Sequence, residues 1–157
     1  MIKIRITLES KEDVIRELII DSENNLEYLH HIIIKNLNLD EFEMASFYLT
    51  DSNLNLGKEI PLFDTSEKGG EVITMNNISI SSVLNSEDSK LIYIYDFMNM
   101  WRFFIEFLEV SEITTEQCTN EVGEMPKKAP DLEFETEVEK DLSTYKEDFE
   151  DLNEYEY

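Results

Sequence analysis

Hydrophobic and polar residues alternate at the beginning of the chain, where polar side chains separate Ile2, Ile4, Ile6 and Leu8. Successive side chains of a β-strand point to opposite faces, so this pattern predicts a strand with one buried face. A second strand is expected at about residues 13–20, after a polar turn.

Later segments also have strand character. Ala45–Thr50 is expected to form a strand, and Leu91–Phe97 is apolar on both faces, which is typical of a strand inside a sheet. A short break separates Leu91–Phe97 from an aromatic-rich partner that begins at Trp101, and this arrangement predicts a β-hairpin. Residues 60–63 can form at most an edge strand, because Pro61 cannot donate a ladder hydrogen bond.

A helix is predicted after the second strand, because four apolar residues recur at helical spacing on one face: Leu26, Leu29, Ile33 and Leu37. Asn24 is the expected N-cap, with Glu27 as its capping-box partner. Tyr28 and Ile32 widen the apolar face, so the helix is expected to pack flat on a sheet. A short helix is predicted at about residues 80–84.

These elements predict an α+β fold, a two-layer sandwich in which one main helix covers a mixed or antiparallel β-sheet. We expect the domain to occupy residues 1–118, a linker residues 119–130 and an acidic tail residues 131–157. The tail holds two lysines and 12 acidic residues, a net charge of −10.

The tail also has an apolar seam, whose residues follow one another at spacings of 4, 3, 4 and 3: Val138, Leu142, Tyr145, Phe149 and Leu152. This period is helical, but an isolated helix of this length is marginal. The seam therefore predicts a conditional helix that docks on the protein's own body or on a partner protein. The alternative is a solvated, disordered extension.

The formal net charge of −23 disfavours direct binding to nucleic acid and to anionic membranes, because both depend on clustered cations. No segment approaches the roughly 18 uninterrupted apolar residues of a membrane span. Cys118 is the only cysteine, so an intrachain disulfide is impossible. These features favour a cytoplasmic protein.

Few residues offer catalytic or metal-binding chemistry. His30 and His31 are the only imidazoles, and as helix neighbours they point about 100° apart and cannot chelate one metal together. His30 is expected at the edge of the core and His31 nearer solvent. Asp96 ends an apolar strand, where an aspartate commonly accepts backbone N–H bonds and fixes a turn.

The remaining candidates also favour a structural role. Trp101, Phe103 and Phe104 could stack on bases or sugars, but core packing fits this acidic chain better. Cys118 lacks a neighbouring cation in the sequence that would activate it as a nucleophile. The sequence thus predicts no catalytic residue, no metal site and no cofactor.

Four blocks resemble, in order and spacing, the plasmid Orf3-like family, which is named after the third open reading frame of a root-inducing plasmid. Its members are also described as insertion-element passenger proteins. The blocks are Leu26–Ile33, Met44–Leu49, Glu59–Asp64 and Leu91–Glu106. The resemblance covers roughly residues 1–118 and implies an α+β domain, but it implies no particular activity.

The chain departs from that family at its hairpin, which usually contains Tyr-Asp-Phe-Gly-Asp followed by a tryptophan and a histidine. The glycine position is Met98, the second aspartate position is Asn99 and the histidine position is Phe103. A polar site that needs the second aspartate and the histidine cannot operate here.

The sequence therefore favours a non-catalytic protein-interaction module that docks through its acidic tail. Two alternatives remain open. An acidic decoy that imitates DNA and binds a basic protein predicts two rows of carboxylates on a rigid body. An enzyme centred on Asp96 predicts a deep pocket near this residue, where other carboxylates or the hydroxyls of Tyr93 and Tyr95 converge.

Overall fold

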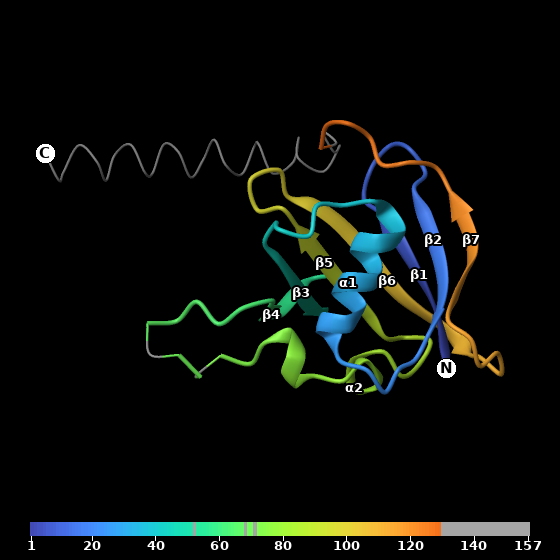
Figure 1. The fold of residues 1–157 in the computed structure, drawn as a ribbon, viewed down its shortest axis with the longest axis horizontal. Coiled ribbons are helices and arrows are strands. Elements are labelled where there is room, and N and C mark those ends of the chain that lie inside the picture. The colour runs from blue at the N-terminus through green and yellow to red at the C-terminus, as the bar shows by residue number, and fades with distance from the viewer. Residues whose placement is uncertain (52, 68, 71, 130–157) are drawn as a thin grey trace, which may run out of the picture.

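The computed structural model describes residues 1–129, apart from residues 52, 68 and 71. Its strands form one seven-stranded sheet in the order β4-β3-β5-β6-β1-β2-β7 (Figure 1). The strands are β1 (Ile2–Leu8), β2 (Ile15–Ile20), β3 (Ala45–Thr50), β4 (Leu56–Pro61), β5 (Lys90–Tyr95), β6 (Trp101–Val110) and β7 (Gln117–Val122). The helices are α1 (Leu26–Leu37), the 3-10 helix η1 (Met75–Asn77) and α2 (Ile80–Val83).

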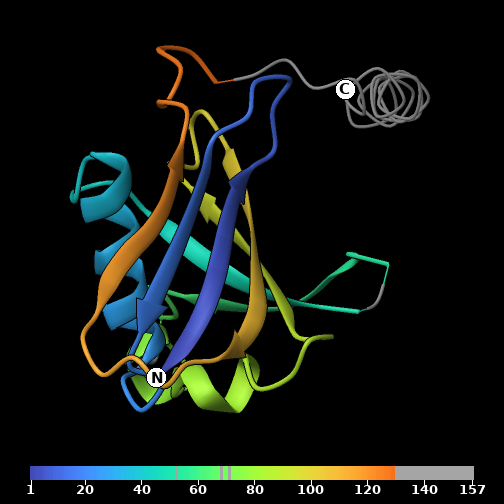
Figure 2. The same cartoon turned by 90° about the vertical axis from the view of Figure 1, so that its right-hand side faces the viewer.

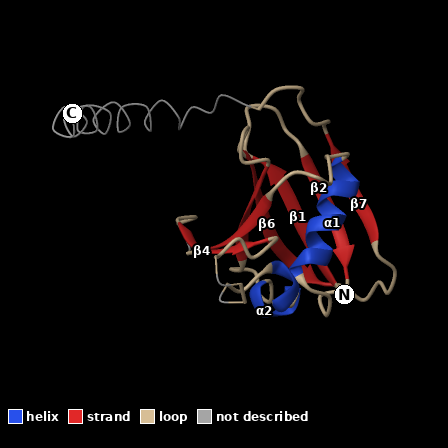
Figure 3. Cartoon of the chain, turned by 60° about the vertical axis from the view of Figure 1, so that its left-hand side comes forward, coloured by secondary structure: helices blue, strands red, loops and turns tan. Residues whose placement is uncertain are grey.

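The predicted fold class, an α+β two-layer sandwich, is wrong, because the described chain is mostly sheet. Every neighbouring pair of strands runs antiparallel, and α1 is the one main helix of the described residues (Figure 3). The prediction failed because β4 is mostly exposed and β7 is exposed throughout. Neither strand shows the apolar alternation by which a strand is recognised in a sequence.

The centre of the sheet agrees with the sequence prediction. All four apolar side chains of β1 are buried, while the intervening residues are half-buried. β5 lies between β3 and β6, and its register with β6, from Lys90↔Glu106 to Tyr95↔Trp101, confirms the predicted hairpin. Pro61 lies in β4 at one edge of the sheet, as its missing donor requires.

Helix α1 begins one residue later than predicted. Its N-cap is Asn25, not Asn24, because the Asn25 side chain accepts a hydrogen bond of 2.9 Å from the backbone N–H of Tyr28. The helix ends at Asn38, which adopts the left-handed conformation that asparagine tolerates. In the part of the chain that the structure describes, no helix has the length and apolar character needed to cross a bilayer.

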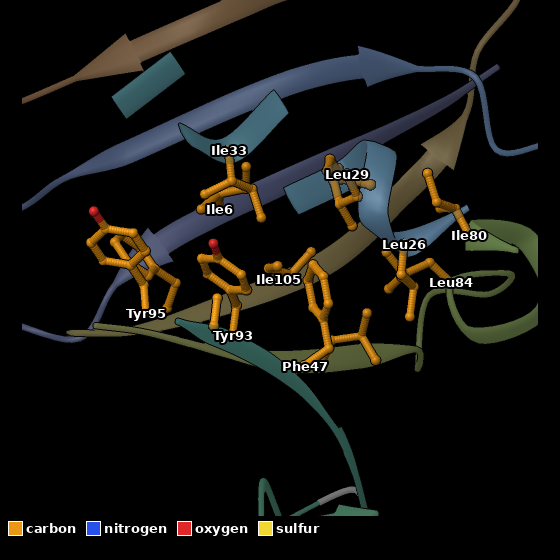
Figure 4. Packing of buried hydrophobic residues seen from close by; sticks show 14 of the residues in the cluster. Ile6, Leu26, Leu29, Ile33, Phe47, Ile80, Leu84, Tyr93, Tyr95 and Ile105 are labelled. Atoms are coloured by element: carbon orange, nitrogen blue, oxygen red, sulfur yellow. The ribbon is translucent and has the colours of Figure 1, made fainter. Parts of the chain in front are cut away.

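The hydrophobic core lies between α1 and one face of the sheet. Leu26, Leu29 and Ile33 of α1 are completely buried and point toward the sheet residues Phe47, Tyr93 and Ile105 (Figure 4). One end of this core is closed by Ile80 of α2 and by Leu84, the residue after that helix, and both are fully buried.

β7 is attached to the sheet mainly by its backbone pairing with β2 and by one buried cation. The guanidinium of Arg16 donates to the carbonyl oxygens of Val122 at 2.9 Å and of Asn36 at 3.3 Å, and it forms a 3.3 Å ion pair with Glu121. It thus joins β7 to the last turn of α1. β7 also crosses the domain boundary predicted at residue 118, and the division into domain, linker and tail remains a prediction.

We expect Arg16→Met to release β7 while leaving the central strands intact, because each lost hydrogen bond to a charged group is worth about 1.5–3 kcal/mol. Hydrogen exchange of the β7 amides that pair with β2 should accelerate about tenfold or more. Arg102→Met is the matched control, because the Arg102–Glu9 ion pair involves β6, which is separated from β7 by β1 and β2, and is partly exposed. Unchanged exchange in β7 of the Arg16 variant would contradict this role.

Candidate functional site

The turn between β5 and β6 is organised by Asp96. Its carboxylate accepts hydrogen bonds from the backbone N–H of Met98 at 3.1 Å and from the Asn99 side chain at 2.6 Å. Its carbonyl oxygen accepts from the backbone N–H groups of Asn99 and Met100. Asp96 is buried and has a φ of 59°, a left-handed conformation that aspartate tolerates better than most residues.

These contacts confirm the prediction that Asp96 fixes the hairpin turn. Both carboxylate oxygens face groups of the same turn, and the two nearby tyrosines point their hydroxyls elsewhere. Tyr93 contacts His30, and Tyr95 donates to the carbonyl oxygen of Asp40 at 2.7 Å. A cavity of about 230 Å³ is lined by residues of α1, β2 and segment 116–118, and Asp96 is not among them.

His30 lies inside the core rather than at its edge, where the sequence placed it. Its side chain is fully buried, and Nδ1 lies 2.7 Å from the hydroxyl of Tyr93. The other ring nitrogen, Nε2, is buried and has no hydrogen-bond partner among the described residues. The ring also contacts His31, with 5.1 Å between the ring centroids.

This burial changes the protonation chemistry of the pair. Burial, followed by the neighbouring His31, lowers the pKa of His30 to about 4, because the core disfavours the charged form. Burial also raises the pKa of the Tyr93 hydroxyl well above its usual value. At neutral pH the pair is a neutral, enclosed hydrogen bond that solvent cannot reach.

The exposed surface of the hairpin end differs sharply from this enclosed pair. Met98 is 91% exposed and Phe42, in the loop after α1, is 87% exposed. Phe97 and Met100 are exposed as well. We call these four residues the apolar tip.

Two hydrogen bonds to backbone carbonyl oxygens hold the loops of the apolar tip together. The backbone N–H of Asp96 donates to the carbonyl oxygen of Met44 at 2.8 Å, and the Tyr95 hydroxyl donates to Asp40. The loop from Asn38 to Met44 and the turn from Asp96 to Met100 therefore form one surface. They lie at the same end of the molecule as the last described residues, near 129 (Figures 1 and 2).

The apolar tip was not found from the sequence. The signal for Phe42 was present, since it stands alone between acidic residues in a segment without strand or helix periodicity. What the sequence could not supply was the register of β3 with β5, which places Ala45 opposite Tyr95 and so joins the two loops.

The other candidate residues lie in separate places. Trp101 and Phe103 are buried in the core, as predicted, whereas Phe104 is only half-buried. Cys118 is exposed on β7. The apolar seam residues Val138, Leu142, Tyr145, Phe149 and Leu152 lie outside the described residues. Within the described part, no three His, Cys, Asp or Glu side chains are placed to hold a metal ion.

The chain matches a known family and a known fold. The model of the plasmid pRiA4b ORF-3-like proteins matches residues 1–135, which confirms the family resemblance seen in the sequence. No curated protein matches. The crystal structure of the protein of unknown function MM3350 from Methanosarcina mazei Go1 is similar in fold, with a TM-score of 0.63 and 15% sequence identity. The similarity covers 80% of this chain and 72% of that one.

We expect Asp96→Ala to lower the free energy of unfolding by about 2 kcal/mol, because it removes the carboxylate's hydrogen bonds and strains the left-handed backbone. Asp96→Gly should cost less, since glycine adopts this conformation freely. Asp96→Asn keeps one acceptor for the Met98 N–H and should cost least. Chemical denaturation measures all three, and an alanine variant as stable as the parent would exclude this role.

We also expect His30 to make stability depend on pH. The pKa of His30 is 6.5 in the unfolded chain, whereas it is about 4 in the folded chain. The unfolded chain therefore binds more protons between these values, and stability falls as the pH drops through this window, by about 2 kcal/mol from pH 7 to pH 5.

This pH dependence can be tested by denaturing three proteins at several pH values. They are the intact chain, His30→Gln and the matched control His31→Gln. The side chain of His31 is more than half exposed and 3.9 Å from Glu27. Only His30→Gln should lose the slope between pH 7 and pH 5. A slope that persists in this variant would assign the effect to other groups.

Proposed function

The chain belongs to the plasmid pRiA4b ORF-3-like family, and we propose that it is a non-catalytic protein-interaction module located in the cytoplasm. It binds a partner protein through the apolar tip and the acidic tail, and it does not bind nucleic acid or a membrane directly. The observation that carries the proposal is the exposure of Met98, on the turn fixed by Asp96, and of Phe42, in the adjoining loop after α1.

The arrangement of reactive groups supports a binding role over an enzyme centred on Asp96. The Asp96 carboxylate is engaged by its own turn, and the His30–Tyr93 pair is enclosed in the core. Large apolar side chains on a surface, by contrast, lose exposure to water when a partner covers them, and this is a driving force for association.

The distribution of charge supports the same role over a decoy that imitates DNA. On the described sheet, the three arginines are each paired with a carboxylate: Arg5 lies 3.4 Å from Glu17, Arg16 lies 3.3 Å from Glu121, and Arg102 lies 3.1 Å from Glu9. Imitation of a phosphate backbone needs rows of carboxylates without such neutralisation.

Capture of proteins from a cell lysate by full-length variants tests the proposal. The variant Phe42→Ser/Met98→Ser alters the tip, and Leu142→Ser/Tyr145→Ser/Phe149→Ser alters the tail. Phe63→Ser is the matched control, because Phe63 is an exposed aromatic residue outside the tip. Each of the two test variants should fail to capture at least one protein that the control captures.

Identical capture by the parent, the control and both test variants would reject the proposed function. Circular dichroism of each variant checks that the fold is kept. Since the side chains of Phe42 and Met98 are almost completely exposed, we expect their replacement to change stability by less than about 0.5 kcal/mol.

A further inference from the structure

The chemistry of the apolar tip specifies what it binds. Phe42 and Phe97 offer rigid aromatic rings, while Met98 and Met100 offer unbranched side chains that adapt to irregular apolar surfaces. Methionine-rich surfaces of this kind accept the apolar face of an amphipathic helix. The turn that carries Phe97, Met98 and Met100 is fixed by Asp96, so these three side chains project from a rigid base.

The two loops that form the tip are acidic. Residues 38–44 and 96–100 include four carboxylates, those of Asp40, Glu41, Glu43 and Asp96, and contain no lysine or arginine. Asp40 and Glu41 are exposed next to Phe42. The apolar side chains are thus bordered by negative charge, and the field at this end attracts cations.

This charge distinguishes between the possible occupants of the tip. A second copy of the chain carries a net charge of −23, and the chain's own tail carries −10, so both are repelled electrostatically.

We propose that the apolar tip binds a cationic amphipathic segment of a partner protein, with the apolar face of that segment on Phe42 and Met98. Its lysines and arginines lie over the carboxylates of Asp40, Glu41 and Glu43. This inference rests on the proposed interaction function and adds the chemistry of the partner. Because the cationic contacts are at the rim, they increase the association rate and weaken with salt.

Titration of the full-length chain with model peptides tests this inference. Trp101 is the only tryptophan and directly follows Met100, so its fluorescence reports binding near the tip. The probes are a leucine–lysine peptide with helical spacing, a scrambled isomer of the same composition, and a leucine–glutamate analogue with the same spacing. None of the peptides contains tryptophan.

We expect the helical leucine–lysine peptide to bind and the other two to bind at least about tenfold more weakly, a difference of about 1.4 kcal/mol. Phe42→Ser/Met98→Ser should weaken binding by a similar factor, whereas the control Phe63→Ser should not. Asp40→Asn/Glu41→Gln/Glu43→Gln should weaken binding at low salt and reduce its salt dependence.

Three outcomes would overturn the inference. Equal binding of the scrambled peptide would mean attraction by charge alone, and equal binding of the leucine–glutamate peptide would mean that charge does not select the partner. Undiminished binding by the Phe42/Met98 variant would place the site elsewhere. If these peptides fail while lysate capture still depends on the tip, the interaction function stands and only its cationic partner is rejected.

Discussion

The packing of α1 against one face of the sheet is the interaction on which the rest of the structure depends. Six buried residues of the helix face the sheet, and each apolar side chain among them contributes about 1.5–3 kcal/mol when fully buried. The same helix holds His30 beside Tyr93 and ends at Asn38, where the loop of the tip begins. One element therefore connects the core to one of the two loops of the apolar tip.

The sequence predicted those elements in which apolar residues recur with the period of a strand or a helix and are buried on one face. β1, α1 and the β5–β6 hairpin each have a periodic apolar face, and all three are found where expected. β7 could not be predicted, because its contribution is backbone pairing and the reach of Arg16, and neither leaves a periodic pattern. Without β7 and the full extent of β4, the amount of sheet was underestimated and the fold class was wrong.

The candidate site likewise has one part that could be predicted from the sequence and another part that could not. The turn-fixing role of Asp96 follows from local chemistry and was predictable, since aspartate hydrogen-bonds to its own backbone in any such turn. The His30–Tyr93 pair and the apolar tip depend on contacts between residues far apart in the chain. Helical spacing placed His30 near the core, but no pattern in the sequence indicates that a tyrosine of β5 lies opposite it.

The position of β1 has a consequence for how the chain acquires its fold. β1 precedes the other described strands in the chain, yet it is an inner strand that pairs with β6, so that Ile2 lies opposite Val110. This contact closes a loop on the order of 100 residues, and contacts of such long range slow folding. On the ribosome, the isoleucines of β1 cannot pack beside β6, the second neighbouring strand, until β6 has been synthesised. During that interval they form an exposed apolar segment to which chaperones can bind.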